Sequence, residues 1–296
     1  MRLKISLKSD KSLFIPFNYN HIISSIIYKK IADLEFASEL HSSKTFKFFT
    51  FSNLNIPQRK IVKNGIISKN GSVNFQISSP NEYLIKNLVE GHLDDLTVNF
   101  KGKKLFVEKI KLLPEPEFKN PMNVKTISPI IVRTKKEIDG KLKIWDLTPA
   151  DQQFYTNLEN NLIKKYNQFY NKQATNTNNE RYNSNNKTRA NNEIFNSNDK
   201  IYINTKTYKN NNKLNIDNDK LSIVGNELNI NDDKVCISSS MGYVKRKRIT
   251  LEKDNIKTFH RAFMMDLELN GDLNLIKFAY DCGLGEKNSL GFGMVE

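Results

Sequence analysis

The sequence predicts an α+β protein built from two tandem ferredoxin-like domains, each with the βαββαβ order that RNA-recognition-motif folds share. Two observations predict this class. In each half, apolar residues switch between the strand period of two and the helix period of about 3.6 in that order. A proline-rich stretch separates the halves, so we place the domains at 1–118 and 126–296, with a linker at 119–125.

The first half opens with a strand over residues 2–8, in which leucine and isoleucine alternate with polar residues. Isoleucines at helical spacing predict a helix over 18–31, and a second short helix follows over 33–41. The alternating aromatic residues of 46–54 favour another strand.

Turn and cap residues predict the rest of the first domain. Two Asn-Gly turns favour a hairpin within 64–79. A helix follows over 79–93, with Ser79 or Asn81 as its N-cap. Strands within 96–113 complete the βαββαβ order.

The second half repeats this order without obvious sequence identity to the first. It predicts a strand, a helix that Thr148 caps, two strands, a closing helix and a last strand, over 126–134, 149–170, 233–251, 259–271, 272–283 and 291–295. An asparagine-rich insertion, 172–232, interrupts it and has few large apolar residues. Because such a segment buries too little apolar surface, we expect its first part to be flexible, with marginal hairpins at 200–209 and 220–230.

The chain carries 46 lysine and arginine residues against 32 acidic ones, a formal net charge of +14. Such a surface attracts polyanions, most often nucleic acid, although a basic solvent-facing surface is the alternative. There is no apolar run of about 18 residues, as a membrane span requires, and no signal-peptide core at the start. Two cysteines without a CxxC pair argue against disulfide and zinc frameworks. We therefore expect a cytoplasmic protein with no membrane partner.

Metal and cofactor motifs are missing from the sequence. The four histidines, His21, His41, His92 and His260, form no pair with metal-ligand spacing. There is also no P-loop and no carboxylate cluster spaced to hold magnesium. We expect no metal and no cofactor, which argues against a metal-dependent nuclease.

The chain ends in a glycine-rich stretch that contains Gly283, Gly285, Gly291 and Gly293. Glycine N–H groups bind phosphate oxygens, and Lys287 adds charge there, whereas tight turns alone are the structural alternative. A dinucleotide fingerprint is excluded because this loop follows a helix and precedes a strand. A basic run in the same half favours RNA binding over a merely solvated strand, and it consists of Lys245, Arg246, Lys247 and Arg248.

Both ends of the chain carry a family resemblance. The final "CGLGEKNSLGFGMVE" resembles the glycine-rich signature of the CRISPR-associated endoribonucleases that process precursor CRISPR RNA, within the repeat-associated mysterious protein (RAMP) superfamily. The opening "FNYNHIISSIIYKKI" and the later "KTFKFFTFSNL" are similar to the start of that family. The asparagine-rich middle departs from the family's compact form.

The resemblance implies two ferredoxin-like domains side by side with a central basic cleft. It implies cleavage of CRISPR repeat RNA, single-stranded or hairpin, without metal. The RNA's own 2′-OH is the nucleophile, and the products end in a 2′,3′-cyclic phosphate and a 5′-OH. Effector-complex subunits and a second copy of the chain are further partners that the resemblance allows.

The resemblance also assigns three catalytic residues. His41 matches the family's histidine after the second helix, Tyr28 matches a tyrosine in the first helix, and Lys47 matches a lysine that follows, with Lys44 as its competitor. Histidine suits proton transfer near neutral pH, and a lysine stabilises charge on the phosphate oxygens. Which proton His41 carries stays open. By position alone, His41 is equally a helix-end residue, Tyr28 a core tyrosine and Lys47 an outward charge.

A second function fits the same features. A non-catalytic RAMP subunit that scaffolds guide RNA in an effector complex would share the fold, the charge and the glycine-rich loop. The two functions differ in whether Tyr28, His41 and Lys47 meet in one cleft. Separated residues, with His41 buried among apolar side chains, would favour the scaffold.

Overall fold

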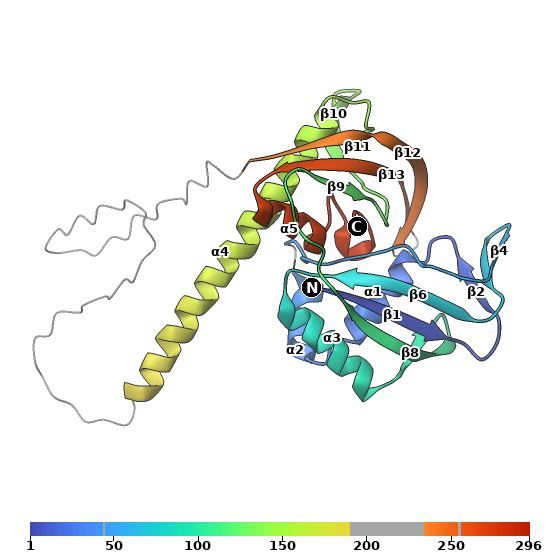
Figure 1. The fold of residues 1–296 in the computed structure, drawn as a ribbon, viewed down its shortest axis with the longest axis horizontal. Coiled ribbons are helices and arrows are strands. Elements are labelled where there is room, and N and C mark those ends of the chain that lie inside the picture. Colours follow the sequence, from blue (N-terminus) through green and yellow to red (C-terminus); the bar gives the residue numbers. More distant parts are fainter. Residues whose placement is uncertain (44, 190–233, 254–255) are drawn as a thin grey trace, which may run out of the picture. The chain divides into compact units, whose positions relative to one another are not determined.

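The computed structural model describes residues 1–43, 45–189, 234–253 and 256–296, and Figure 1 shows the fold. The chain divides into two units, residues 1–170 with 233–296, and residues 171–232. The elements and the site described below belong to the first unit, apart from the carboxy-terminal part of one helix. Lys44 and the two hairpins expected within 200–230 lie outside the described residues.

The alternating residues of the first half form an antiparallel five-stranded sheet in the order β3-β6-β1-β8-β7. Its centre is β1 (Arg2–Lys8), which pairs with β6 (Ser72–Ser78) on one side and β8 (Lys103–Leu113) on the other. The outer strands are β3 (Thr50–Phe51) and β7 (Thr97–Phe100). Without β7, the order is that of a ferredoxin-like sheet, which confirms the predicted fold class for this half.

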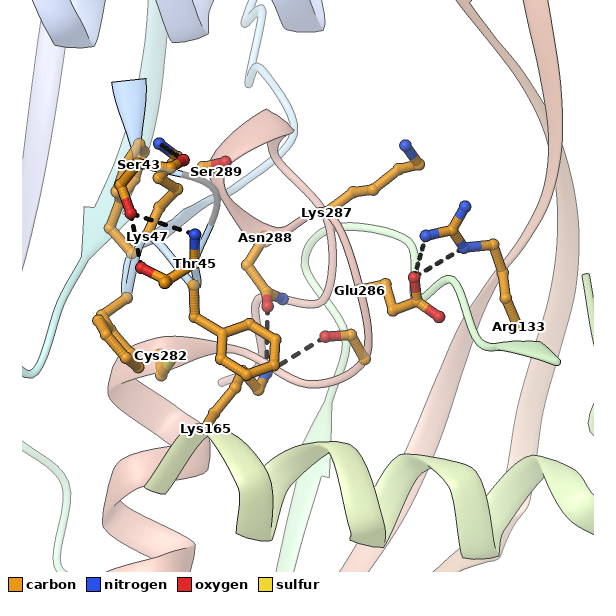
Figure 2. Close-up of a pocket in the computed structure, with 14 residues that line it drawn as sticks. Ser43, Thr45, Lys47, Arg133, Lys165, Cys282, Glu286, Lys287, Asn288 and Ser289 are labelled. Carbon is orange, nitrogen blue, oxygen red and sulfur yellow. Dashed lines mark hydrogen bonds and ion pairs between the residues drawn. The ribbon is translucent and has the colours of Figure 1, made fainter. Parts of the chain in front are cut away.

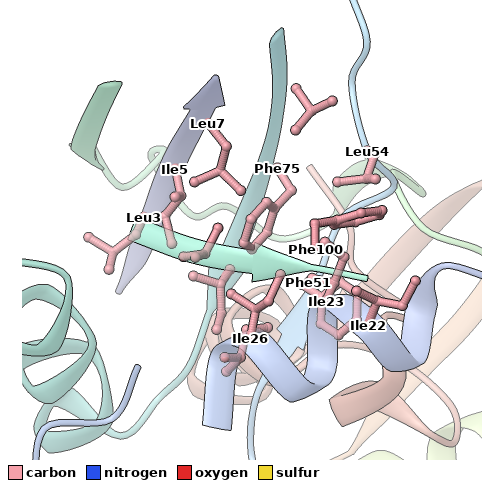
Figure 3. Close-up of a cluster of buried hydrophobic side chains, with 14 of the residues drawn as sticks. Leu3, Ile5, Leu7, Ile22, Ile23, Ile26, Phe51, Leu54, Phe75 and Phe100 are labelled. Atoms are coloured by element: carbon pink, nitrogen blue, oxygen red, sulfur yellow. The ribbon is translucent and has the colours of Figure 1, made fainter. Parts of the chain in front are cut away.

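Three helices cover this sheet: α1 (Asn20–Lys29), α2 (Leu34–Ser42) and α3 (Glu82–Asp94). Asn81 caps α3, as one of the two predicted alternatives, because its side chain accepts a hydrogen bond from the N–H of Leu84. Figure 3 shows the apolar face of α1 against the buried face of the sheet. The buried side chains that meet there include Leu3, Ile5, Leu7, Ile22, Ile23, Ile26 and Phe75.

The predicted aromatic strand over 46–54 is wrong in its extent, because only Thr50 and Phe51 (β3) form a strand there. Phe48 has a φ of 49°, which turns the backbone out of the strand conformation. Its ring packs 5.1 Å from the ring of Phe169, which lies in the second half. Tertiary packing therefore overrides the alternating pattern.

The hairpin predicted within 64–79 is wrong in its pairing, because its two strands, 65–68 and 72–78, lie in different sheets. β2 (Leu13–Pro16), β5 (Gly65–Ser68) and β4 (Arg59–Val62) form a small separate sheet in the order β2-β5-β4. β2 lies far from β5 in the sequence and β4 precedes the predicted hairpin, so the Asn-Gly turns did not predict this sheet.

The second half repeats the sheet order of the first. β12 (Val235–Lys253), β13 (Ile256–Gly271) and β9 (Met122–Lys125) are neighbours in the order β12-β13-β9. The chain end takes the fourth place, since the N–H groups of Lys125 and Glu296 donate to each other's carbonyls at 2.7 and 2.8 Å. β9 lies within the segment expected to be the linker, and the domain boundaries stay a prediction.

Helices complete the second ferredoxin-like arrangement. They are α4 (Gln153–Arg189), α5 (Leu273–Cys282) and a single 3-10 turn, η1 (Asn288–Leu290), in the glycine-rich loop. A hairpin of β10 (Arg133–Ile138) and β11 (Lys141–Asp146) precedes α4. No described helix is both long and apolar enough to cross a membrane.

α4 differs from its prediction at both ends. Thr148 does not cap it, because the N–H and hydroxyl of Thr148 donate to the Asp151 carboxylate in a turn that precedes the helix. At the other end α4 continues to Arg189, so residues 172–189, which we expected to be flexible, are helical. The rest of the insertion lies outside the described residues.

Arg2 joins the two halves from the face of β1 opposite the apolar core. Its side chain is 2% exposed, and Nη2 donates to the carbonyls of Tyr280 and Val295 at 2.9 and 2.8 Å. The guanidinium carbon lies 3.6 Å from the centre of the Tyr280 ring. Burial lowers the pKa of Arg2, and these carbonyls and the aromatic face offset the cost of burying its charge.

We expect Arg2→Met to lower the free energy of unfolding by roughly 2–4 kcal/mol, because two charge-assisted hydrogen bonds are lost and their acceptors stay buried. Urea unfolding of the purified protein measures this loss. The control is Arg59→Met at an exposed position of β4, for which a change within about 0.5 kcal/mol is expected. Equal unfolding curves for the two variants would contradict the role of Arg2 as a link between the halves.

Candidate active site

α1 and α2 place Tyr28 and His41 next to each other. Their ring centres lie 5.1 Å apart and the rings are nearly perpendicular, at 85°. His41 occupies the last turn of α2 and is exposed, whereas Tyr28 is half-buried and contacts the core through Phe49, with ring centres 5.8 Å apart. An exposed imidazole thus lies against a fixed phenol, within reach of a ligand.

The phenol of Tyr28 also reaches the second half of the chain. Burial raises the pKa of Tyr28 to about 12, although a hydrogen bond with Ser289 opposes the shift. Its hydroxyl therefore keeps its proton at neutral pH and is suited to donate a hydrogen bond rather than to act as a base. Because Ser289 belongs to η1, Tyr28 connects the histidine to the glycine-rich loop.

The Lys47 side chain contacts the carboxy-terminal end of α2, next to the backbone of His41. Its ammonium donates to the carbonyls of Leu40, His41 and Ser43, the last two at 3.0 and 2.6 Å. A cation at these carbonyls stabilises the helix C-terminus and holds the backbone of the histidine. The three residues named by the family resemblance therefore lie together.

The glycine-rich loop depends on backbone conformations that other residues avoid. All four glycines have positive φ, between 67° and 83°, and all four are buried. The N–H groups of Gly283, Gly291 and Gly293 donate to the carbonyls of Ala279, Asn288 and Pro129 at 2.8–2.9 Å. Three of the amides expected to bind phosphate are thus used within the protein, which favours the tight-turn alternative for these glycines.

Two of the glycines also allow a close approach. A Cβ on Gly291 would lie 2.2 Å from the Phe51 ring in β3, and a Cβ on Gly293 would lie 1.8 Å from the Leu284 carbonyl oxygen. Polar groups of the first half complete the contact. Asn20 and Ser24 of α1 donate to the carbonyls of Leu290 and Ser289 at 2.8 and 3.0 Å.

Lys165 of α4 binds the glycine-rich loop, and the sequence analysis did not predict this contact. Its Nζ donates to Gly283 O at 2.5 Å, to Gly285 O at 3.2 Å and to Asn288 Oδ1 at 3.1 Å, and Figure 2 shows the last two of these contacts. The side chain is 1% exposed, and burial lowers its pKa. The available signal was a lysine at a core position of α4, on the same helical face as Phe154, Leu158, Leu162 and Phe169.

A pocket of about 280 Å³ lies between residues 43 and 45–49 on one side and the glycine-rich loop on the other (Figure 2). Four cationic side chains line it: Lys47, Arg133, Lys165 and Lys287. Burial lowers the pKa of Lys287, and Arg133 lowers it further, while Arg133 forms an ion pair with Glu286. Ser289, the partner of Tyr28, also lines this pocket. We call it the basic pocket, and its charge suits a phosphate.

The basic run on β12 divides between two faces of the sheet. Lys245 and Lys247 pair with Met264 and Ala262, and paired residues of antiparallel strands share a face. Ala262 packs against Phe292 in the glycine-rich loop, so these two lysines share the loop's face. Arg246 and Arg248 point to the other face, where the Arg248 guanidinium lies 4.9 Å from the Phe259 ring centre.

Two of the other histidines bind groups outside this arrangement. His92 and His260 are buried, and their Nδ1 atoms lie 2.6 Å from Leu88 O and 3.3 Å from Asp146 Oδ1. Within the described ranges, no three His, Cys, Asp or Glu side chains are grouped as metal ligands. The expected independence from metal and cofactors stays a prediction.

Two ferredoxin-like domains, with a glycine-rich loop of the second packed against the first, define a protein of the RAMP class. Family models agree: "CRISPR-associated protein Cas6, N-terminal" matches residues 14–111, and "CRISPR associated protein Cas6, C-terminal" matches residues 113–296. The chain belongs to the Cas6 family of CRISPR-associated proteins. The family resemblance seen in the sequence is confirmed.

Relatives match along the whole chain. The "CRISPR-associated endoribonuclease Cas6 1" of Methanocaldococcus jannaschii is 34% identical, and the alignment covers 100% of this chain and 92% of the relative. A solved structure described as "CRISPR associated protein Cas6" is 34% identical with a TM-score of 0.68, over 100% of this chain and 98% of that one. Another, described as "An RAMP protein binding different RNA substrates", is 26% identical with a TM-score of 0.68, over 100% and 98%.

We expect Gly293→Ala to destabilise the protein more than Gly102→Ala, although both glycines have positive φ. A Cβ at Gly102 meets nothing within 4 Å, so only the backbone cost of about 1–2 kcal/mol applies there. At Gly293 the clash with Leu284 adds roughly 1–3 kcal/mol. Chemical unfolding of the two variants measures the difference. Equal losses would show that the loop relaxes around the new methyl group.

Proposed function

We propose that this chain is a metal-independent endoribonuclease that cleaves CRISPR repeat RNA in precursor transcripts, in the cytoplasm, to make mature guide RNAs. That the chain is an endoribonuclease follows from its family and from relatives that carry this activity in their names. The repeat RNA as substrate and the independence from metal are our proposals. Both proposals rest on the pairing of His41 with Tyr28 beside the basic pocket.

The proposed reaction is an internal transesterification. The 2′-OH of the nucleotide before the scissile bond attacks the phosphorus, and the bond from phosphorus to the 5′ oxygen breaks. One product ends in a 2′,3′-cyclic phosphate and the other in a 5′-OH. The reaction needs one proton removed from the 2′-OH and one delivered to the leaving oxygen.

His41 carries the proton transfer in this proposal, because imidazole titrates near neutral pH and this side chain is exposed. Tyr28 keeps its proton and donates a hydrogen bond to the charged transition state. Lys47 orients His41 through the backbone carbonyls and adds positive charge. Lys44 remains its competitor for the family's third position.

Lys287 and Arg133 offset the phosphate charge from the basic pocket. Lys245 and Lys247 extend the positive surface on the face of the glycine-rich loop. Arg246 and Arg248 bind RNA only where the RNA strand passes around the edge of the β12-β13-β9 sheet. The four glycines give the loop its shape. We also propose that the chain retains its product for effector subunits, as a monomer or a dimer.

We expect His41→Ala to reduce the cleavage rate about 10²–10⁴-fold and to leave RNA affinity unchanged, because proton transfer is lost and the basic pocket is kept. Single-turnover cleavage and filter binding of the chain's own repeat RNA measure the two effects. His21→Ala, at an exposed position of α1, is the matched control and should cleave normally. Full activity in His41→Ala would refute the site, and binding without cleavage by the wild type would favour the scaffolding subunit.

Cleavage by the wild type should continue in excess EDTA, because the attacking group belongs to the RNA and the charges belong to the protein. A repeat RNA with a 2′-deoxy sugar at the scissile nucleotide should bind and stay uncut. Gel analysis of both reactions, with the end groups identified by mass, provides the measurement. Activity that stops in EDTA, or cleavage of the deoxy RNA, would exclude the mechanism.

A further inference from the structure

A second pocket, of about 250 Å³, adjoins the basic pocket. The two pockets share a wall made of Arg133, Gly285 and Glu286. The opposite wall is the side of α4 that carries Asn157, Asn160, Asn161 and Lys164. We call it the asparagine pocket.

The spacing of these residues makes the wall a continuous strip. Asn157, Asn161 and Lys164 follow each other by four and three residues, so they lie on one side of the helix. The apolar face and Lys165 lie beside this side, since Leu158, Leu162 and Lys165 are buried. α4 therefore holds the glycine-rich loop with one face and lines the asparagine pocket with the next.

Asn161 presents an unused hydrogen-bonding atom. Its Oδ1 is buried, and no hydrogen-bond partner for it exists among the described residues. The neighbouring Asn157 differs, because its Nδ2 donates to Arg133 O at 3.1 Å. A buried acceptor without a donor costs free energy, which is recovered when the Asn161 amide turns toward the pocket that it lines and accepts a hydrogen bond from a ligand there.

The hydrogen-bond acceptors next to α4, rather than the net charge of the pocket, favour a base there. Glu286 stands on the shared wall, where Arg133 contacts its Oε2, and a carboxylate repels a phosphate. Asn161 Oδ1 and this carboxylate are both hydrogen-bond acceptors, which suits the amino group of an unpaired base. Lys164 is exposed at the rim, where a backbone phosphate would follow that base.

We propose that the asparagine pocket binds one unpaired, amino-bearing base of the RNA, next to the nucleotides at the cleavage site. Asn161 accepts a hydrogen bond from its amino group, and Lys164 contacts the adjoining phosphate. The inference rests on the proposed function, because a strand that crosses the basic pocket enters the asparagine pocket past their shared wall. The pocket thereby selects the base at one position of the repeat.

The test uses uncleavable repeat RNAs with a 2′-deoxy scissile nucleotide. One RNA is intact, and each of the others has a single abasic site near the cleavage position. Asn161→Leu should weaken binding of the intact RNA roughly 3- to 30-fold. One of the abasic RNAs lacks the base that the asparagine pocket binds. For that RNA, Asn161→Leu and the wild type should have equal affinity. The same position with uracil should behave like the abasic RNA.

Asn167→Leu is the matched control. It lies on the same helix, its Oδ1 is also buried without a partner among the described residues, and it does not line this pocket. It should bind every RNA as the wild type does. Lys164→Gln, at an exposed position, should weaken binding of all the RNAs and reduce the slope of log affinity against log salt by about 0.7.

Three outcomes would overturn the subsite while wild-type cleavage upholds the proposed function. They are unchanged binding in Asn161→Leu, a loss in Asn161→Leu that persists on every abasic RNA, and unchanged binding in Lys164→Gln. A wild type that neither binds nor cleaves the repeat RNA would refute the proposed function itself, and the subsite with it.

Discussion

The close packing of the glycine-rich loop against β3 is the constraint on which the site depends. At Gly291 the loop lies so near Phe51 that a single methyl group would clash with the ring. The Thr50 hydroxyl donates to Phe292 O at 2.8 Å and joins the same two segments. Because Gly291 has no side chain to hold the loop away from Phe51, Ser289 of η1 reaches Tyr28, and the candidate site combines this turn with the first two helices.

A buried cation supports this packing. Removing the Lys165 ammonium from water is costly, and three oxygens of the glycine-rich loop offset the cost. The arrangement ties the conformation of the loop to α4, whose neighbouring face lines the asparagine pocket. One helix thus organises both the basic pocket and the surface beside it, and the Arg133–Glu286 ion pair forms the wall between them.

Much of the fold could be predicted because its signals are local. The alternation in β1 and the isoleucine spacing in α1 depend only on neighbouring residues. The misjudged elements have non-local causes. Phe48 leaves its strand to pack on Phe169, and β2 joins a sheet with strands that follow much later. Thr148 was misjudged for a local reason, because it hydrogen-bonds to Asp151 in a turn before α4 instead of capping that helix.

For the site, the residue types and their places on helices were readable from the sequence: a histidine at the end of α2, a tyrosine on α1 and glycines where the backbone needs positive φ. Their convergence was not. The 5.1 Å between Tyr28 and His41, the burial of Lys165 under the loop and the division of the basic run between two faces arise from packing between distant segments. Short-range patterns specify elements, whereas the relative positions of charges follow from which apolar faces those elements bury.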